Sequence, residues 1–269
     1  MGHRTVTGRA QGVHRQRAVA VAAAQPNRSG LQIGSALLTL LVLAGAWAIS
    51  APRAGAANFT PPAGCQMTMT VQNRSCTVSQ YYTCSADPEG YQRSAHFGQD
   101  GLFHMSTIDA ETRWIESQST NSGLIDRLVE GAEDDASFSE LIETGRDEFD
   151  FETETDDGQR LRHQGFDILT GETVTIDGQD LERTEFQLTT RIADGEVLIE
   201  RSGSQYVSRD FGRFFGGVET SSDWTGARTQ TDDSPVLFIF PGEAGFGSTT
   251  PQFDCDQLMT QIPQERATS

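Results

Sequence analysis

The chain has 269 residues, of which 20 are basic and 38 acidic, and its formal net charge is −18. So acidic a surface argues against binding to nucleic acid or to an anionic membrane surface, because both of these partners are negatively charged themselves. The remaining function classes are soluble enzymes, binding proteins and structural proteins that act on neutral, apolar or cationic partners.

The first 57 residues have the pattern of an export signal. Five Arg residues and no acid occur in residues 1–30, an uncharged apolar run extends from Ser35 to Ser50, and Ala54-Gly55-Ala56 is a small-residue cleavage site. We therefore expect a periplasmic or secreted protein of a Gram-negative bacterium. The alternative is an uncleaved membrane anchor, since Leu31–Ile49 is nearly long enough to span a bilayer.

Four cysteines follow this segment, and an even number in an exported chain predicts two disulfide bonds. A turn at Arg74-Ser75 would set Cys65 opposite Cys84. Cys76 and Cys84 are separated by too much extended chain to pair, so the expected bonds are Cys65–Cys84 and Cys76–Cys255. No C-x-x-C spacing supports the zinc alternative.

Strand-like segments come first in the predicted domain, which covers residues 58–262 and precedes a disordered tail at 263–269. Cys65–Cys84 forms a hairpin, and a second hairpin joins Tyr91–Phe97 to Leu102–Ile108, with Thr112–Ser117 as the next strand. Residues 121–145 then break the β pattern. Two short amphipathic helices are predicted there, one from the apolar series Leu124, Ile125, Leu128 and Val129, the other from the capping box Ser137–Glu140 and a terminal Gly145.

A β-meander follows, from Gly145 to Val218, in which three Asp-Gly pairs mark the turns. A two-residue turn at Asp157-Gly158 sets Glu152 opposite His163 and Phe149 opposite Phe166. The turn at Asp177-Gly178 sets Val174 opposite Leu181, with a bulge near Glu182 or Arg183, and the turn at Asp194-Gly195 sets Phe186 opposite Gly203. The inner face should then carry Phe149, Phe151, Phe166, Phe186, Leu188 and Ile192.

The last third of the chain contains three further apolar or aromatic segments. Phe211, Phe214 and Phe215 predict an aromatic strand that closes the sheet, Val218–Trp224 a last strand, and Val236–Phe240 an apolar run. The predicted fold class is therefore mainly β, a curved antiparallel sheet or half-barrel with two short helices covering its apolar face.

Three groups of side chains are candidates for chemistry, and each has a simpler structural interpretation. His96 and His104 face each other across a turn, as a metal-binding or solvated pair. Glu152 and His163 form the base–orienter half of a triad, or a surface ion pair. The acids Glu152, Glu154, Asp156 and Asp157 form a calcium loop, or a solvated strand face. We favour the structural interpretation each time, and predict no catalytic residue, cofactor or metal.

Gly171–Gly178, followed by Tyr206-Val207-Ser208 and Phe214–Gly217, resembles uncharacterised exported proteins of alphaproteobacteria. The layout of long antiparallel strands with a helical plug is also similar to the periplasmic lipoprotein-carrier fold. That similarity implies a half-barrel whose concave apolar face is covered by helices.

The expected function is that of a non-catalytic exported binding or envelope-associated protein, with another protein or an apolar small molecule as its partner. The alternative is a carrier of an apolar ligand such as a lipid in a half-barrel cavity, with an unrecognised hydrolase around His163 or His104 as a third reading.

Overall fold

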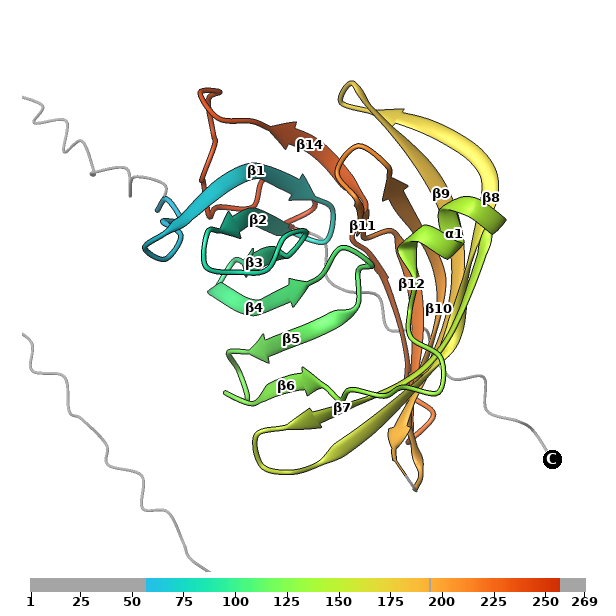
Figure 1. The fold of residues 1–269 in the computed structure, drawn as a ribbon. Coiled ribbons are helices and arrows are strands. Elements are labelled where there is room, and N and C mark those ends of the chain that lie inside the picture. Colours follow the sequence, from blue (N-terminus) through green and yellow to red (C-terminus); the bar gives the residue numbers. More distant parts are fainter. Residues whose placement is uncertain (1–56, 194, 257–269) are drawn as a thin grey trace, which may run out of the picture. The chain divides into compact units, whose positions relative to one another are not determined.

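The computed structural model describes residues 57–193 and 195–256 (Figure 1). The expected signal segment, apart from its last residue, and the expected tail at 263–269 lie outside these residues. Within them, no helix has the length and apolar character needed to cross a membrane.

The described residues form one antiparallel sheet of fourteen strands. The first seven are β1 (Cys65–Asn73), β2 (Thr77–Cys84), β3 (Gln92–Gly98), β4 (Gly101–Ile108), β5 (Trp114–Ser119), β6 (Ile125–Leu128) and β7 (Arg146–Thr155). The others are β8 (Arg160–Ile176), β9 (Gln179–Ile192), β10 (Val197–Ser208), β11 (Arg213–Phe215), β12 (Val218–Asp223), β13 (Arg228–Asp232) and β14 (Pro235–Ile239).

Strands β1 to β10 pair with their neighbours in sequence, as a meander does. β12 continues the sheet beside β10, β11 pairs with β10 alone, and β14 returns to pair with β1. The two end strands, β13 and β14, are joined through Asp233 and Ser234, but no ladder pairs them among the described residues, so the sheet stays open. The fold is mainly β as expected, while a half-barrel is not established.

One of the two predicted helices is present among the described residues. It is α1 (Phe138–Thr144), which begins where the Ser137 side chain accepts a hydrogen bond from the backbone N–H of Glu140 and ends at Gly145, whose φ is 85°. The other prediction was wrong, because the segment after Leu124 is the strand β6. Its backbone pairs with β5 on one side and β7 on the other, and this pairing overrides the helical spacing of its apolar residues.

The Asp-Gly turns were predicted correctly in part. Val174 lies opposite Leu181, and Phe186 opposite Gly203. The bulge expected near Glu182 or Arg183 of β9 is present where β8 pairs with those residues. Its extra residues lie on β8, between Leu169 and Thr173.

The register after Asp157-Gly158 is shifted by one residue from the prediction. Thr155 donates its backbone N–H to the carbonyl of Gln159, so this pair closes a three-residue loop, Asp156–Gly158, in place of the two-residue turn. The Asp157 carboxylate stabilises this loop by accepting hydrogen bonds from the Thr155 hydroxyl and the Gln159 N–H. His163 therefore lies opposite Phe151, and Glu152 lies opposite Arg162.

An apolar core fills the concave side of the sheet where β1 and β2 approach β9, β10, β11 and β14. Its buried residues are Met69, Val71, Tyr81, Leu181, Tyr206, Phe215 and Phe238. The apolar face is thus covered mainly by β11, β14 and the far end of the β8–β9 hairpin, in place of two helices (Figure 1). The helix α1 packs on β7 and β8, and its Phe138 ring contacts that of Phe214.

The predicted inner face of the long strands is confirmed in part. Phe151, Phe186 and Leu188 are buried. Ile192 is 39% exposed near the end of β9. Phe166 lies under the guanidinium of Arg146, with Glu148 opposite it, because the register shift turns it to the other face of β8.

Candidate functional site

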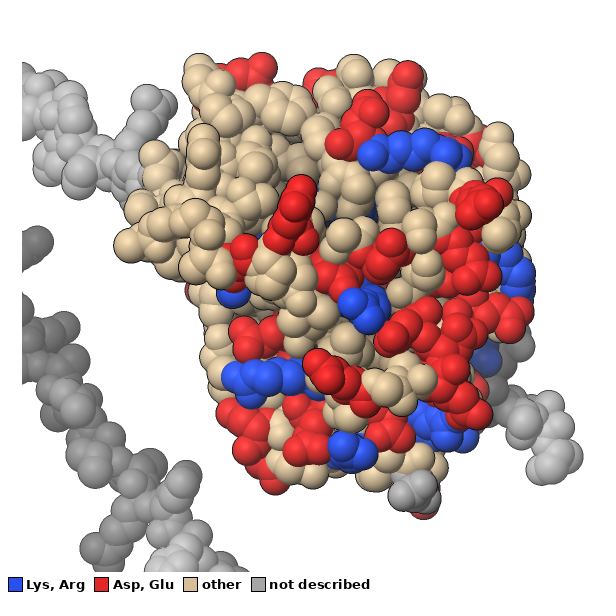
Figure 2. All heavy atoms as spheres, viewed as in Figure 1, with Lys and Arg blue, Asp and Glu red and all other residues tan. Residues whose placement is uncertain are grey.

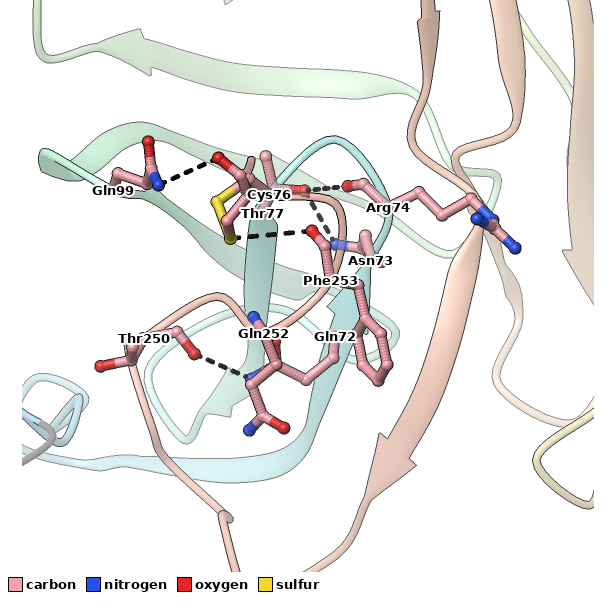
Figure 3. The surroundings of a disulfide bond; sticks show 10 residues. Gln72, Asn73, Arg74, Cys76, Thr77, Gln99, Thr250, Gln252 and Phe253 are labelled. Carbon is pink, nitrogen blue, oxygen red and sulfur yellow. Dashed lines mark hydrogen bonds between the residues drawn. A yellow bond between two sulfur atoms is a disulfide. The ribbon is translucent and has the colours of Figure 1, made fainter. Parts of the chain in front are cut away.

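The two expected disulfides are present, Cys65–Cys84 across the β1–β2 hairpin and Cys76–Cys255 between residues 179 positions apart. The second bond attaches the C-terminal segment to the start of β2 (Figure 3). The segment is held further by Gln80 and Gln72, whose side-chain N–H groups donate to the carbonyls of Ser248 and Thr250 over 2.7 and 3.1 Å.

His163 lies on the concave side of the sheet and is 4% exposed, contrary to the expected surface pair with Glu152. Its ring nitrogens lie 2.9 Å from the Thr153 hydroxyl and 3.1 Å from the Thr190 hydroxyl. The ring stacks on Phe151, with 5.0 Å between centroids, and burial lowers the pKa of His163 to about 4. It is a neutral cross-strand link whose polar atoms are already bonded.

His96 and His104 face each other as expected, with ring centroids 5.7 Å apart. The His96 nitrogens are bonded to the hydroxyls of Ser79 and Ser94, and burial, His104 and Arg213 together lower the pKa of His96 to about 3. No group of three His, Cys, Asp or Glu side chains suited to a metal ion occurs in the part of the chain that the structure describes.

The acidic strand face of β7 is paired with arginine. Arg160 reaches Glu154 at 2.8 Å and Glu152 at 3.3 Å, and Arg162 reaches Asp150 at 2.6 Å. Red acidic atoms dominate the lower right of Figure 2, with blue arginines between them. This arrangement is a ladder of surface ion pairs, whose attraction is weakened by the surrounding water.

The concave side of the sheet contains a cavity of about 230 Å³ that none of these residues had indicated. It lies between β7–β12, the ends of β4 and β5, and the chain before α1. Five aromatic side chains line it, from Trp114, Phe149, Phe151, Phe186 and Phe214. Its polar lining comes from Asp147, Asp167, Arg201, Gln205, Arg213 and Glu219.

Asp147 and Asp167 lie directly opposite each other on β7 and β8. Residues so paired have Cβ atoms about 5 Å apart. Each carboxylate has one buried oxygen without a hydrogen-bond partner, and Asp147 is only 4% exposed. Burial raises the pKa of Asp167 to about 7, with a further contribution from Asp147, and burial raises the pKa of Asp147 to about 6.

Two arginines line the same cavity and have partners of their own. The guanidinium of Arg213 lies 3.8 Å from the centre of the Tyr81 ring and donates to the Gln92 side-chain oxygen over 3.0 Å. Arg201 lies 3.6 Å from the Glu219 carboxylate. Arg213 is 6% exposed and its Nε has no partner.

Sequence reasoning missed this site. Neither Asp147 nor Asp167 was singled out from the sequence, although both have the odd-numbered parity of the buried Phe151 and His163. The available signal was an acidic residue at a position that alternation places on the apolar face. Recognising that two such acids meet requires the correct β7–β8 register.

Comparison of the chain with protein-family models, curated proteins and solved structures gave no match.

Proposed function

We propose that this protein is an exported, non-catalytic binding protein that holds a small ligand in the concave cavity. The observation that carries the proposal is the concave cavity in which an aromatic wall meets buried polar atoms without partners. Pockets of this kind, mostly apolar with a few convergent polar groups, are the usual form of small-molecule sites. Two disulfides support export, since such bonds persist in oxidising compartments.

The size of the cavity bears on the alternative of a lipid carrier. A volume of about 230 Å³ is below the range of about 300–1,000 Å³ for sites that enclose drug-sized ligands. Charged groups also lie along the wall, where an acyl chain would leave them without solvent. These features favour a compact, polar-headed molecule over a long apolar chain.

A cavity-filling variant tests the proposal. Leu188 lines the cavity and is 6% exposed, so Leu188→Trp should occupy the ligand's space. We expect small-molecule fragments that bind the native protein, detected by ligand-observed NMR, to lose binding in this variant. Val218→Trp on the outer face of β12 is the control, because Val218 is 36% exposed. Unchanged fragment binding in a folded Leu188→Trp protein would exclude the cavity as the binding site.

A second candidate function is hydrolysis, supported by the acid pair itself. Paired carboxyl groups with raised pKa values are typical of general-acid sites. The expected centre therefore moves from His163 or His104 to Asp147 and Asp167. An activity screen on the native protein, repeated with Asp147→Asn and Asp167→Asn, would support this function only if both substitutions abolish the same activity.

A further inference from the structure

We infer that the ligand of the concave cavity is an organic cation, a protonated amine with a compact aromatic or aliphatic body, whose ammonium group binds between Asp147 and Asp167. The inference rests on the proposed binding function and names the class of ligand. It starts from the two inward carboxylates on paired positions of β7 and β8, each with a buried oxygen that lacks a hydrogen-bond partner. An ammonium group supplies N–H donors for those oxygens and a charge opposite to theirs.

The charged groups that act on the acid pair are all negative. Those that act on Asp147 come from Glu140 of α1, from Glu111 before β5 and from Asp134 before α1, and all three are acidic. The charge that acts on Asp167 is that of Asp147. Buried carboxylates are normally paired with a cation or a full set of donors. The acid end of the cavity therefore has a deficit of positive charge.

The two arginines of the cavity do not fill this deficit. Arg213 of β11 is stacked on Tyr81 and bonded to Gln92, while Arg201 of β10 is paired with Glu219 of β12. One nitrogen of each arginine, Nε, is also buried without a hydrogen-bond partner. The cavity therefore has a donor end at the two arginines and an acceptor end at the two acids, and the named contacts of the arginines do not include Asp147 or Asp167.

The aromatic wall suits the same ligand. Trp114 and Phe151 stand edge to face with centroids 5.6 Å apart, and the Phe149 ring lies 5.8 Å from that of Phe151. Aromatic faces attract cations, tryptophan most strongly, and they also pack against an apolar body. A cavity of about 230 Å³ has room for a compact ligand such as phenethylammonium.

The charge of the whole protein acts in the same direction. With a net charge of −18 and an acidic surface over the long strands (Figure 2), the protein attracts cations and repels anions over long range. An anionic ligand would approach against this field and then meet two carboxylates.

The test compares three probes of similar shape by calorimetry at pH 7.5: phenethylammonium, neutral 2-phenylethanol and anionic 3-phenylpropionate. We expect phenethylammonium to bind most tightly, and Asp147→Asn or Asp167→Asn to weaken it by at least about tenfold, the effect of losing one charge-assisted contact. Glu148→Gln, which removes a charge from the outer face of β7, should change the affinity by less than about twofold.

The outcomes separate the two proposals. Tighter binding of 3-phenylpropionate or 2-phenylethanol that Leu188→Trp abolishes would overturn the cation inference and leave the binding function standing. Failure of phenethylammonium to bind also overturns the inference. If no fragment binds the native protein in a way that Leu188→Trp abolishes, the proposed binding function is excluded as well. If the Asn variants unfold, carbon NMR of the native protein decides instead. Phenethylammonium should then lower the pKa of Asp167, and an unchanged value contradicts the inference.

Discussion

Two regions of the sheet differ in whether their buried polar side chains have hydrogen-bond partners. The disulfide-bonded region (β1–β3, β14 and residues 246–255) has no charged residue in β1 or β2, and its buried Gln72 and Gln80 are bonded to the C-terminal segment. The pocket region (β7–β12) has charged residues at most positions of β7, and its inward Asp147 and Asp167 each have an oxygen without a partner.

The contrast supports the proposed binding site in the pocket region. Buried polar atoms in folded proteins nearly always have partners, and unpaired ones lower stability. In the disulfide-bonded region the chain supplies these partners itself, so the face is closed. In the pocket region it does not, which is the compromise expected at a binding site, where function is retained against stability.

The largest expected effect on stability comes from the Cys76–Cys255 bond of the disulfide-bonded region. Replacing Cys76 and Cys255 with Ser opens a link between residues 179 positions apart and should lower the unfolding free energy by up to about 5 kcal/mol. The control replaces Cys65 and Cys84, whose separation is 19, and should lower it by about 3 kcal/mol. Denaturant unfolding measures both. A larger loss from the shorter link would show that the C-terminal segment is not what stabilises this region.

Gly165→Ala should disrupt the pocket region. A Cβ at Gly165 would lie 2.0 Å from the Gln187 carbonyl oxygen and 2.9 Å from the Phe149 ring, so β8 and β9 must separate. We expect a loss of about 2–3 kcal/mol, as for overpacked sites. At Gly98, on β3, the nearest atom to an added Cβ is a Phe103 ring carbon at 3.7 Å, and Gly98→Ala is the control. Similar thermal stabilities for the two variants would contradict this account of the strand contact.

Gln80→Ala tests the buried hydrogen bonds of the disulfide-bonded region. It removes the 2.7 Å hydrogen bond to Ser248 and the acceptor for the Thr70 hydroxyl, both of them buried. The expected loss of unfolding free energy is about 2 kcal/mol. Gln187→Ala, at an exposed position of β9, should cost less than about 0.5 kcal/mol. The comparison fails if both variants unfold at the same denaturant concentration.

Asp167→Asn should change the pH dependence of stability. The folded-state pKa of Asp167 is about 7 against an ordinary value of 3.8, so the folded protein binds more protons between pH 4 and pH 7. The contribution of Asp167 to stability is present below pH 4 and is lost as the pH rises through 7, by at most about 1.4 kcal/mol per pH unit. Asp167→Asn removes this loss, so its stability relative to the native protein should increase towards pH 7.

Unfolding measured across this pH range checks the prediction. His163 and His96 have lowered pKa values and lose stability as the pH falls, but they are common to both proteins and cancel in the difference. Asp100→Asn, which removes one carboxylate from an exposed turn, is the control. A difference that stays constant with pH would show that Asp167 is not buried as described.

Local chemistry explains which parts of the fold were predictable. Ser137 and Gly145 cap α1, and Asp177-Gly178 sets the β8–β9 register, because each signal acts within a few residues of itself. The three-residue loop at Asp157 depends on one carboxylate that accepts hydrogen bonds from the Thr155 hydroxyl and the Gln159 N–H, and a single-residue shift reverses every side chain of the strand. That shift is why His163 was assigned to the wrong face.

By itself the sequence determined the class of the fold, the acidic surface, the helix at Phe138 and the pairing of four cysteines, since these follow from alternation, charge and chain reach. Export and ligand binding stay proposals. Only the tertiary structure decided that β6 is a strand, that the C-terminal segment covers β1 and β2, and that Asp147 and Asp167 meet beside an aromatic cavity. Each of these depends on contacts between segments far apart in the chain, where burial and pairing outweigh the local preference of the residues involved.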